Sequence, residues 1–204
     1  MSSTEYGPLK KPLGISFPKD RQALYKMAMM YVKKDYDWAE FGVHEGRTAK
    51  LWLTHLPLDK KIYLFDSFEG LPEDWAGVNN FGETRLTTKG TFALDKVPTF
   101  NDDRAIIKAG WFEDAVPAFV KNYDKEALSF VHLDADLYSS TKTVLDGIKH
   151  LINPDTVLLF DEFCGDPRHQ AHEYKAFTEF ISENNLTPEY LCNDRNNRVA
   201  LRLK

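Results

Sequence analysis

Four carboxylates follow two apolar runs of this sequence, and together they could bind a cation. Asp134 and Asp136 end one run, and Asp161 and Glu162 end the next apolar run along the chain. If both runs are neighbouring parallel strands, they end at the same edge of one sheet, so folding brings the four side chains together. Like charges held that close are costly unless a cation neutralises them, and Mg²⁺ suits carboxylate oxygens. The sequence therefore predicts a magnesium site, although each carboxylate could instead cap a loop or a helix.

The stretch from Glu40 to Gly46 is a second candidate site. An apolar run ends there in a G-x-x-x-G turn formed by Gly42 and Gly46, and a helical pattern opens at Thr48. Glycines let the backbone approach a ligand where a Cβ would collide, and such strand–turn–helix units build cofactor sites in open α/β sheets. The G-x-G-x-x-G spacing of dinucleotide sites is missing, and Glu40 suits a cationic group better than a phosphate. The turn indicates a cofactor with a positive group, or else only a tight structural turn.

Further candidate residues follow other predicted strands. Asp66 ends the strand that follows the glycine turn. In doubly wound folds a carboxylate at this sequence separation accepts hydrogen bonds from ribose hydroxyls, although Asp66 could instead cap the next turn. Gly110, Trp111 and Phe112 follow another strand, where an aromatic ring could cover a flat base or pack at a helix start. His132 shares a strand face with one of the four carboxylates and could be a base, although a histidine in a buried strand is more often a core residue.

Composition places the chain among ordinary globular proteins. The chain has 204 residues, of which 43% are hydrophobic and 28% charged, and its net charge is −5. This charge gives no reason to expect a nucleic-acid partner. Two cysteines fit a reducing compartment, and no apolar run is long enough to span a membrane, so we expect a cytoplasmic protein without a membrane partner. We expect one domain over residues 1–204, and a homo-oligomer is possible.

Alternating patterns indicate the fold. Apolar runs predict buried parallel strands at 37–43, 61–65, 105–109, 128–133 and 156–160. Helical spacing predicts helices at 48–56, 113–122, 140–151 and 169–184, besides one that Asp20 can cap. The last two strands, 187–192 and 198–203, are joined by a polar turn and read as a hairpin. We therefore expect a doubly wound, mostly parallel α/β sheet of the Rossmann-like kind with a terminal antiparallel strand.

Two segments break this alternation. Residues 1–35 read as an N-terminal arm followed by a helix. Residues 67–103 carry several aromatics and glycines but little periodicity. So long an irregular connection inside a compact domain is usually functional, so we expect a lid or substrate loop rather than a disordered insertion.

Five ordered segments, taken together, resemble a known family. They are 40–46, 65–72, 111–114, 132–141 and 160–162. They resemble class I S-adenosylmethionine-dependent methyltransferases of the macrocin O-methyltransferase type, which act on sugar hydroxyls of macrolides. The resemblance runs from about residue 36 to residue 185 and is far more specific than any single segment.

The resemblance implies that S-adenosyl-L-methionine is the cofactor. By this resemblance Glu40, Gly42 and Gly46 bound the methionine part, Asp66 holds the ribose, and residues 110–112 lie by the adenine. The expected cofactor-binding residues are Glu40, Gly42, Val43, Gly46, Asp66, Ser67, Phe68, Gly110, Trp111, Phe112 and Asp134.

The resemblance also implies a Mg²⁺ ion held by Asp134, Asp161 and Glu162. At the last pair this chain has Asp-Glu where the family often has Asp-Asp. The expected function is a Mg²⁺-assisted O-methyltransferase acting on a hydroxyl of a small molecule such as a sugar or glycosylated metabolite, with Asp134 or a loop residue taking the proton. The alternatives are a metal-dependent nucleotide-sugar transferase, a nicotinamide-dependent oxidoreductase, and a catalytically silent binding module.

Overall fold

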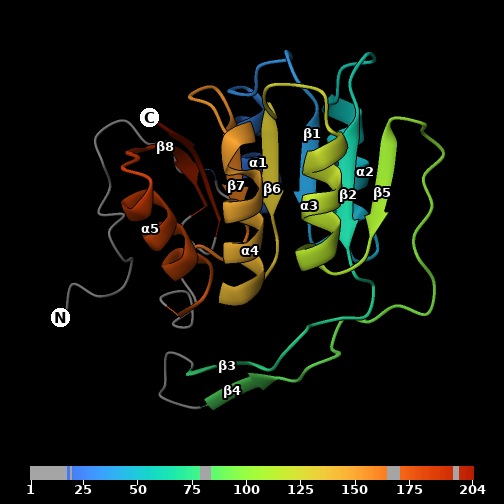
Figure 1. Ribbon diagram of the computed structural model, residues 1–204, viewed down its shortest axis with the longest axis vertical. Helices are drawn as coiled ribbons and strands as arrows, with labels where there is room; N and C mark the ends of the chain where they lie inside the picture. Colours follow the sequence, from blue (N-terminus) through green and yellow to red (C-terminus); the bar gives the residue numbers. More distant parts are fainter. Residues whose placement is uncertain (1–17, 19, 79–83, 165–170, 195–197) are drawn as a thin grey trace.

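A mostly parallel sheet forms the centre of the protein (Figure 1). The computed structural model describes residues 18, 20–78, 84–164, 171–194 and 198–204. Within them seven strands pair in the order β5-β2-β1-β6-β7-β9-β8, and β9 runs antiparallel to both its neighbours. The strands are β1 (Trp38–Phe41), β2 (Ile62–Asp66), β5 (Ala105–Ala109), β6 (Phe130–Leu133), β7 (Val157–Phe160), β8 (Pro188–Asn193) and β9 (Val199–Leu203). The expected doubly wound sheet with a terminal antiparallel strand is confirmed, and the hairpin turn at 195–197 lies outside the described residues.

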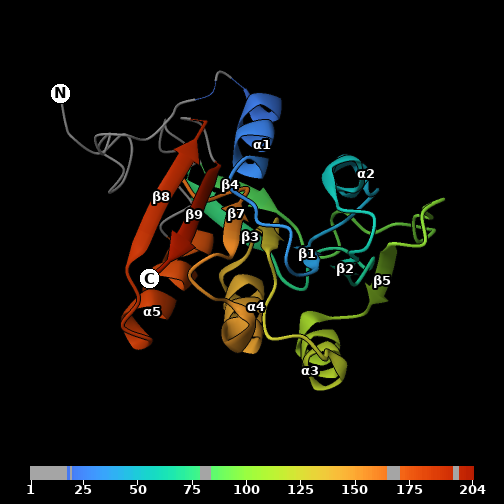
Figure 2. The ribbon, with the colours of Figure 1, turned by 90° about the horizontal axis from the view of Figure 1, so that it is seen from above.

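Helices cover both faces of the sheet, as Figure 2 shows. One face carries α1 (Arg21–Met29) and α2 (Arg47–His55); the other carries α3 (Phe112–Asn122), α4 (Tyr138–Ile148), which leads into the short 3₁₀ helix η1 (Lys149–Leu151), and α5 (Glu173–Glu183). Asp20 caps α1 as expected, because its side chain accepts a hydrogen bond from the backbone N–H of Ala23 at 2.8 Å. Helix α5 starts later than predicted, and residues 169 and 170 lie outside the described part. Among the described residues we find no helix that is long and apolar enough to cross a membrane.

The strands alternate their side chains between two hydrophobic cores. Phe41 belongs to the core that includes residues of α3, α4 and α5, whereas Trp38 belongs to the core that includes residues of α1 and α2. Because the side-chain period of a strand is two, Glu40 projects to the same side as Trp38. His132 is opposite Glu40 in the β1–β6 register and projects to that side too. Glu40 and His132 are therefore buried polar side chains that project from the sheet toward α1 and α2. Both belong to strands whose carboxyl ends lead into the candidate site.

Residues 67–103 contain a two-stranded antiparallel ribbon that the sequence analysis did not predict. Strand β3 (Trp75–Val78) pairs with β4 (Thr84–Thr87), and the ribbon lies below the carboxyl ends of the parallel strands (Figure 1). Strands of only four residues are too short to show a readable period, so the apolar pattern did not predict them. The chain on either side of the ribbon is joined by a hydrogen bond from Leu71 N–H to Thr91 O at 2.9 Å. The described parts of this segment, 67–78 and 84–103, are thus joined to each other by strand pairing and a backbone hydrogen bond.

Candidate active site

A cavity of about 450 Å³ opens at the carboxyl ends of β1, β2, β6 and β7. Small-molecule sites in open α/β folds occur at this edge, where the strand order reverses. The cavity brings together many of the residues singled out from the sequence: Gly42, Val43, Asp66, Ser67, Trp111, Phe112, Asp134, Asp136, Asp161 and Glu162. It is also lined by Arg21, Trp75, Phe92 and Arg198, which the sequence analysis did not select.

The glycine turn after β1 makes closer contact than any other residue type would allow. Gly42 has a φ of +89°, and a Cβ built on it would lie 1.8 Å from the carbonyl oxygen of Asp134. Gly46 has a φ of +72° and begins α2, where a Cβ would meet the ring of Phe100 at 2.6 Å. Gly42 therefore locks the β1 turn against the β6 turn at the cavity wall, whereas Gly46 packs against the segment 67–103.

Asp66 holds the turns around it. Its Oδ2 accepts hydrogen bonds from the backbone N–H groups of Val43 and His44, both at 2.8 Å, and its Oδ1 accepts one from Phe68 N–H at 2.7 Å. A carboxylate offers about four acceptor positions, so backbone donors fill three of them and about one remains. The capping role considered for this residue is present, and the ribose role remains a prediction. Phe68 is buried with a φ of +60°.

Glu40 lies behind the turn rather than in the cavity. Its side chain is fully buried, accepts a hydrogen bond from Trp52 Nε1 at 3.1 Å and pairs with His132 Nδ1 at 2.9 Å. The structure thus brings Glu40 to α2 and β6, and does not bring it to the cavity surface. The segment after β5 does reach the cavity, because Trp111 and Phe112 line it. Gly110 lies outside the lining, and its N–H donates a hydrogen bond to the carbonyl oxygen of Asp66 at 3.0 Å.

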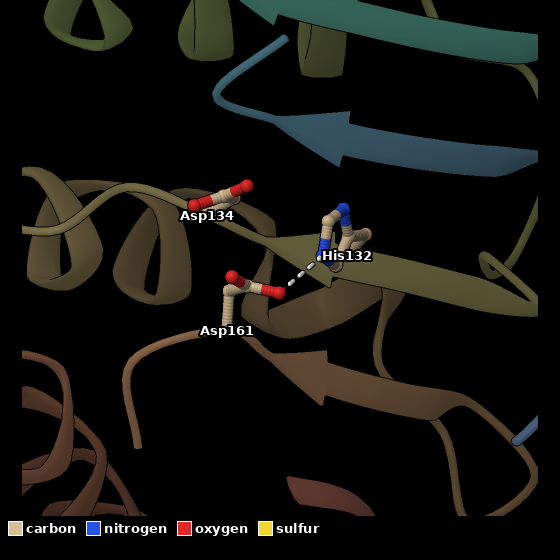
Figure 3. A group of neighbouring side chains, drawn as sticks. All are labelled: His132, Asp134 and Asp161. Atoms are coloured by element: carbon tan, nitrogen blue, oxygen red, sulfur yellow. Dashed lines mark ion pairs between the residues drawn. The ribbon is translucent and has the colours of Figure 1, made fainter. Parts of the chain in front are cut away.

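Of the four carboxylates predicted to meet at this edge, two come together with a histidine, whereas Asp136 and Glu162 line the cavity outside this group. His132, Asp134 and Asp161 each offer a ligand atom, and these atoms lie within 4.8 Å of one another (Figure 3). Nε2 of His132 is 3.7 Å from Oδ1 of Asp161, an ion-pair distance that is too long for a hydrogen bond. Glu162 lines the same cavity and is partly buried.

Charges within the cluster shift one another's protonation. Burial and the nearby Asp161 raise the pKa of Asp134 well above its usual value. Burial would lower the pKa of His132, but its contacts with Asp161 and Glu40 outweigh that effect and raise it to about 10. Burial would likewise raise the pKa of Asp161, and the cations His132, Arg198 and Arg21 bring it below its usual value instead. Asp161 is therefore a strongly ionised carboxylate among cations, and the neighbouring Asp134 is a carboxylate that is protonated more easily.

Asp161 is also tied to elements far away in the sequence. It accepts hydrogen bonds from Tyr25 Oη at 2.8 Å, from Arg198 Nε at 2.8 Å and from Arg198 Nη2 at 3.0 Å. Arg198 could have been found from the sequence. It begins the antiparallel last strand, and that strand must start at the edge where the parallel strands end. Tyr25 and Arg21 come from α1, and nothing in the sequence pattern linked that helix to this edge.

Glu173 is a buried carboxylate that the sequence analysis also missed. It lies in the first turn of α5 and accepts hydrogen bonds from the backbone N–H of Glu162 at 2.9 Å and of Ala135 at 3.3 Å. Burial raises its pKa well above the usual value. Glu173 therefore joins the turns after β6 and β7, which carry the predicted metal ligands.

Comparison with known proteins finds a curated relative of this chain. A curated relative from Streptomyces olivaceus, 8-demethyl-8-(2,3-dimethoxy-alpha-L-rhamnosyl)-tetracenomycin-C 4'-O-methyltransferase, is 28% identical over 155 residues. The match covers 69% of this chain and 58% of that relative, so the chain spans less than two thirds of the relative's length.

Solved structures share the fold. The calicheamicin methyltransferase CalS11 superposes with a TM-score of 0.65 at 23% identity, covering 89% of this chain and 76% of that one. The O-methyltransferase NovP gives 0.60 at 19% identity, covering 89% and 76%. An O-methyltransferase from Bacillus cereus, solved in complex with SAH, gives 0.56 at 15% identity, covering 95% and 84%.

A family model covers most of the chain. The model described as Macrocin-O-methyltransferase (TylF) matches residues 32–190, which include the glycine turn, Asp66 and the acidic cluster. The match agrees with the resemblance drawn from the five sequence segments. With the fold and the sheet-edge cavity described above, it shows that this chain belongs to the macrocin O-methyltransferase family.

Proposed function

We propose that the chain binds S-adenosyl-L-methionine in the sheet-edge cavity and methylates a hydroxyl of a small glycosylated molecule with the assistance of Mg²⁺. The observation that carries the proposal is the contact of Gly42 with Asp134, which places a turn without a Cβ directly beside an acidic cluster. Family membership supports the reaction class. The name of the Streptomyces olivaceus relative, which methylates a rhamnosyl compound, supports a sugar hydroxyl as the acceptor.

The residues present fit the cofactor. A cavity of about 450 Å³ is within the range of roughly 300–1,000 Å³ found for small-molecule sites. Trp111 and Phe112 offer flat apolar surfaces for the adenine, and Asp66 keeps an acceptor position for a ribose hydroxyl. Glu40 would act from beneath the turn by holding Trp52 and His132 in place. S-adenosylmethionine supplies a sulfonium methyl group, an electrophile that needs no further activation.

The donor set also fits a divalent cation. Carboxylates are the ligands that Mg²⁺ prefers, and the residues that would hold it are Asp134 and Asp161, which offer ligand atoms within 4.8 Å of each other, and Glu162, which lines the same cavity. Nε2 of His132, which has no hydrogen-bond partner among the described residues, faces the same place and could donate to a water molecule held by the ion. When bound there, Mg²⁺ would supply Lewis acidity that lowers the pKa of the acceptor hydroxyl.

The chain's own groups would position the acceptor and take its proton. We assign proton acceptance to the Asp134 carboxylate, which lines the cavity next to the glycine turn. As the acceptor oxygen forms its bond to the methyl carbon, the carbon–sulfur bond breaks and the hydroxyl proton passes to Asp134. Holding the acceptor in line with that bond is the main contribution that the cavity walls can make.

We further propose that residues 67–103 act as a lid over the cavity. Leu71 and Trp75 pack against Leu137 and line the cavity, and Ser139 Oγ donates a hydrogen bond to Glu73 at 2.6 Å. These contacts tie the segment to the start of α4 and would keep water from the reaction. Cleavage by a protease within 67–103 should slow when S-adenosylhomocysteine and an acceptor are present. Equal cleavage rates with and without them would contradict the lid.

Calorimetric titration distinguishes the proposed function from its alternatives. S-adenosylmethionine or S-adenosylhomocysteine should bind with micromolar affinity, about −8 kcal/mol, whereas NAD⁺ and UDP-sugars should show no saturable binding. Transfer of a labelled methyl group to a panel of glycosylated acceptors then tests catalysis. Saturable binding of NAD⁺ or a UDP-sugar in place of S-adenosylmethionine would overturn the proposal.

A further inference from the structure

Arg21 occupies the space between the two carboxylates of the acidic cluster. Its Nη2 is 3.4 Å from both carboxylate oxygens of Asp161 and 3.8 Å from Oδ2 of Asp134. The Arg21 side chain is 45% exposed and projects into the cavity from the first turn of α1. A cation that bridges Asp134 and Asp161 would have to lie in the region that this guanidinium group now neutralises.

The hydrogen bonds of Asp161 show which of its acceptor positions is contested. Tyr25 Oη and the Nε and Nη2 of Arg198 lie at 2.8–3.0 Å and fill three of the roughly four acceptor positions of the carboxylate. Arg21 reaches the remaining position from a longer distance. Arg198 is 14% exposed and also pairs with Asp194, so it is fixed in place, whereas Arg21 is half in solvent. Arg21 also donates a hydrogen bond from Nε to Tyr25 Oη, and its departure would break this contact. Of the two arginines, Arg21 is still the more exposed and the more weakly bound partner of Asp161.

A second observation marks the cluster as a place for a ligand. The imidazole of His132 is fully buried, and its Nε2 has no hydrogen-bond partner among the described residues, although it is directed toward Asp161. Buried polar atoms are seldom left without a partner, so this atom indicates that a bound acceptor, such as a water molecule, completes the site.

We propose that Arg21 and a divalent cation are alternative occupants of the Asp134–Asp161 site. This inference rests on the proposed function, because it concerns the metal that the proposal assigns there. A Mg²⁺ ion lies about 2.0–2.1 Å from its carboxylate oxygens, so it would be within a few ångströms of Nη2, where two positive charges repel strongly. Arg21 then moves into solvent. Helix α1 stays in place, because Leu24, Tyr25 and Ala28 are buried in the core.

This arrangement gives Arg21 a definite role. While the metal is absent, Arg21 neutralises carboxylates that would otherwise repel one another at the sheet edge. When the metal binds, breaking the Arg21 contacts opposes binding, so Arg21 lowers the metal affinity of the chain. Removing the Arg21 charge should therefore strengthen metal binding, which is the opposite of what a residue that supports the site would do.

The test measures Mn²⁺ binding by the intensity of the free-ion electron paramagnetic resonance signal and by calorimetry, without any methyl transfer. Arg21→Gln should bind Mn²⁺ about tenfold more tightly than the natural chain, which corresponds to about 1.4 kcal/mol. Arg21→Lys keeps the charge and should stay close to the natural affinity. The matched control is Lys26→Gln, which removes the same charge from an exposed position on the same helix and should leave the affinity unchanged.

The outcomes separate this inference from the proposed metal site. Mn²⁺ binding that is equal or weaker in Arg21→Gln overturns the inference, and so does an equal gain in Lys26→Gln, since that gain would reflect net charge alone. Asp134→Asn tests the site itself. If it weakens Mn²⁺ binding while Arg21→Gln has no effect, the metal site stands and the Arg21 inference fails. If the natural chain binds no Mn²⁺ that Asp134→Asn weakens, the metal site fails and the inference falls with it.

Discussion

The backbone N–H of His44 donates a 2.8 Å hydrogen bond to the Asp66 carboxylate, which joins the turn after β1 to the end of β2. The N–H of Val43 donates to the same oxygen. His44 has a φ of +47°, a left-handed conformation that is uncommon for residues other than glycine. The carboxylate of Asp66 therefore stabilises a turn that its own sequence would not favour, and this turn forms one wall of the cavity.

Replacing Asp66 should affect both cofactor binding and stability. Asp66→Ala removes an acceptor used by three backbone N–H groups, and hydrogen bonds to a charged group are worth about 1.5–3 kcal/mol each. S-adenosylhomocysteine affinity, measured by calorimetry, should fall at least tenfold, and the urea midpoint should fall as well. Asp59→Ala, at an exposed carboxylate, is the control. Unchanged affinity in Asp66→Ala would remove the ribose assignment.

Gly42 and Gly90 form a matched pair for the close contact at the cavity wall. Their φ angles are +89° and +81°, but a Cβ at Gly42 would overlap Asp134 O, whereas a Cβ at Gly90 meets nothing within 4 Å. Gly90→Ala should lose only about 1–2 kcal/mol of folding free energy to backbone strain. Gly42→Ala should lose more than about 4 kcal/mol because backbone must move. Urea unfolding checks this, and similar losses in the two variants would show that the contact is unimportant.

The predicted metal ligands should differ in what their loss does to the fold. Glu162→Gln should abolish methyl transfer with little change in melting temperature, as chelation with EDTA should. Asp161→Asn should lower both, because it leaves the largely buried Arg198 with a weakened partner. Calorimetry should show that S-adenosylhomocysteine still binds to Glu162→Gln and to the EDTA-treated protein. Full turnover in excess EDTA would rule out a metal requirement.

The Asp102–Arg104 pair should make stability depend on pH in acid. Hydrogen bonds from Arg104 lower the pKa of Asp102 from 3.8 to about 2, and Arg104 in turn donates to the carbonyl oxygens of Leu53 and Leu56 at the end of α2. A lowered pKa stabilises the folded state above pH 3.8, and this contribution is lost as the pH falls toward 2. Asp102→Asn should therefore lower the melting temperature at pH 7, and the difference from the natural chain should shrink below pH 4. A difference that stays constant down to pH 3 would contradict this.

Local patterns were enough to predict the sheet. Residues 105–109 form a strand with the predicted bounds, and strands β1, β6 and β7 lie within their predicted ranges. Convergence of the strand-end carboxylates followed from parallel topology alone, and the structure confirms that Asp134 and Asp161 meet. Such predictions succeed because side-chain period and strand direction fix which groups reach one edge.

Contacts between elements distant in the sequence could not be predicted in the same way. Arg21 and Tyr25 contact Asp161 only because α1 packs over the part of the sheet that contains β7. Helical spacing in the sequence does not determine this placement. The burial of Glu40 depends on Trp52 and His132, which lie on two other elements. In both cases a carboxylate contacts its partners only through tertiary packing. A single sequence does not show which helix covers which strand.

The contact between Gly42 and Asp134 O also limits how this protein can change. The turn proposed to hold the methyl donor and the turn proposed to hold the acceptor press against each other through backbone atoms, so neither can be reshaped without shifting the other. Variation in either turn would disturb both halves of the reaction at once. Changes in acceptor preference, whether natural or engineered, should therefore accumulate in the segment 67–103, where Leu71, Trp75 and Phe92 line the cavity.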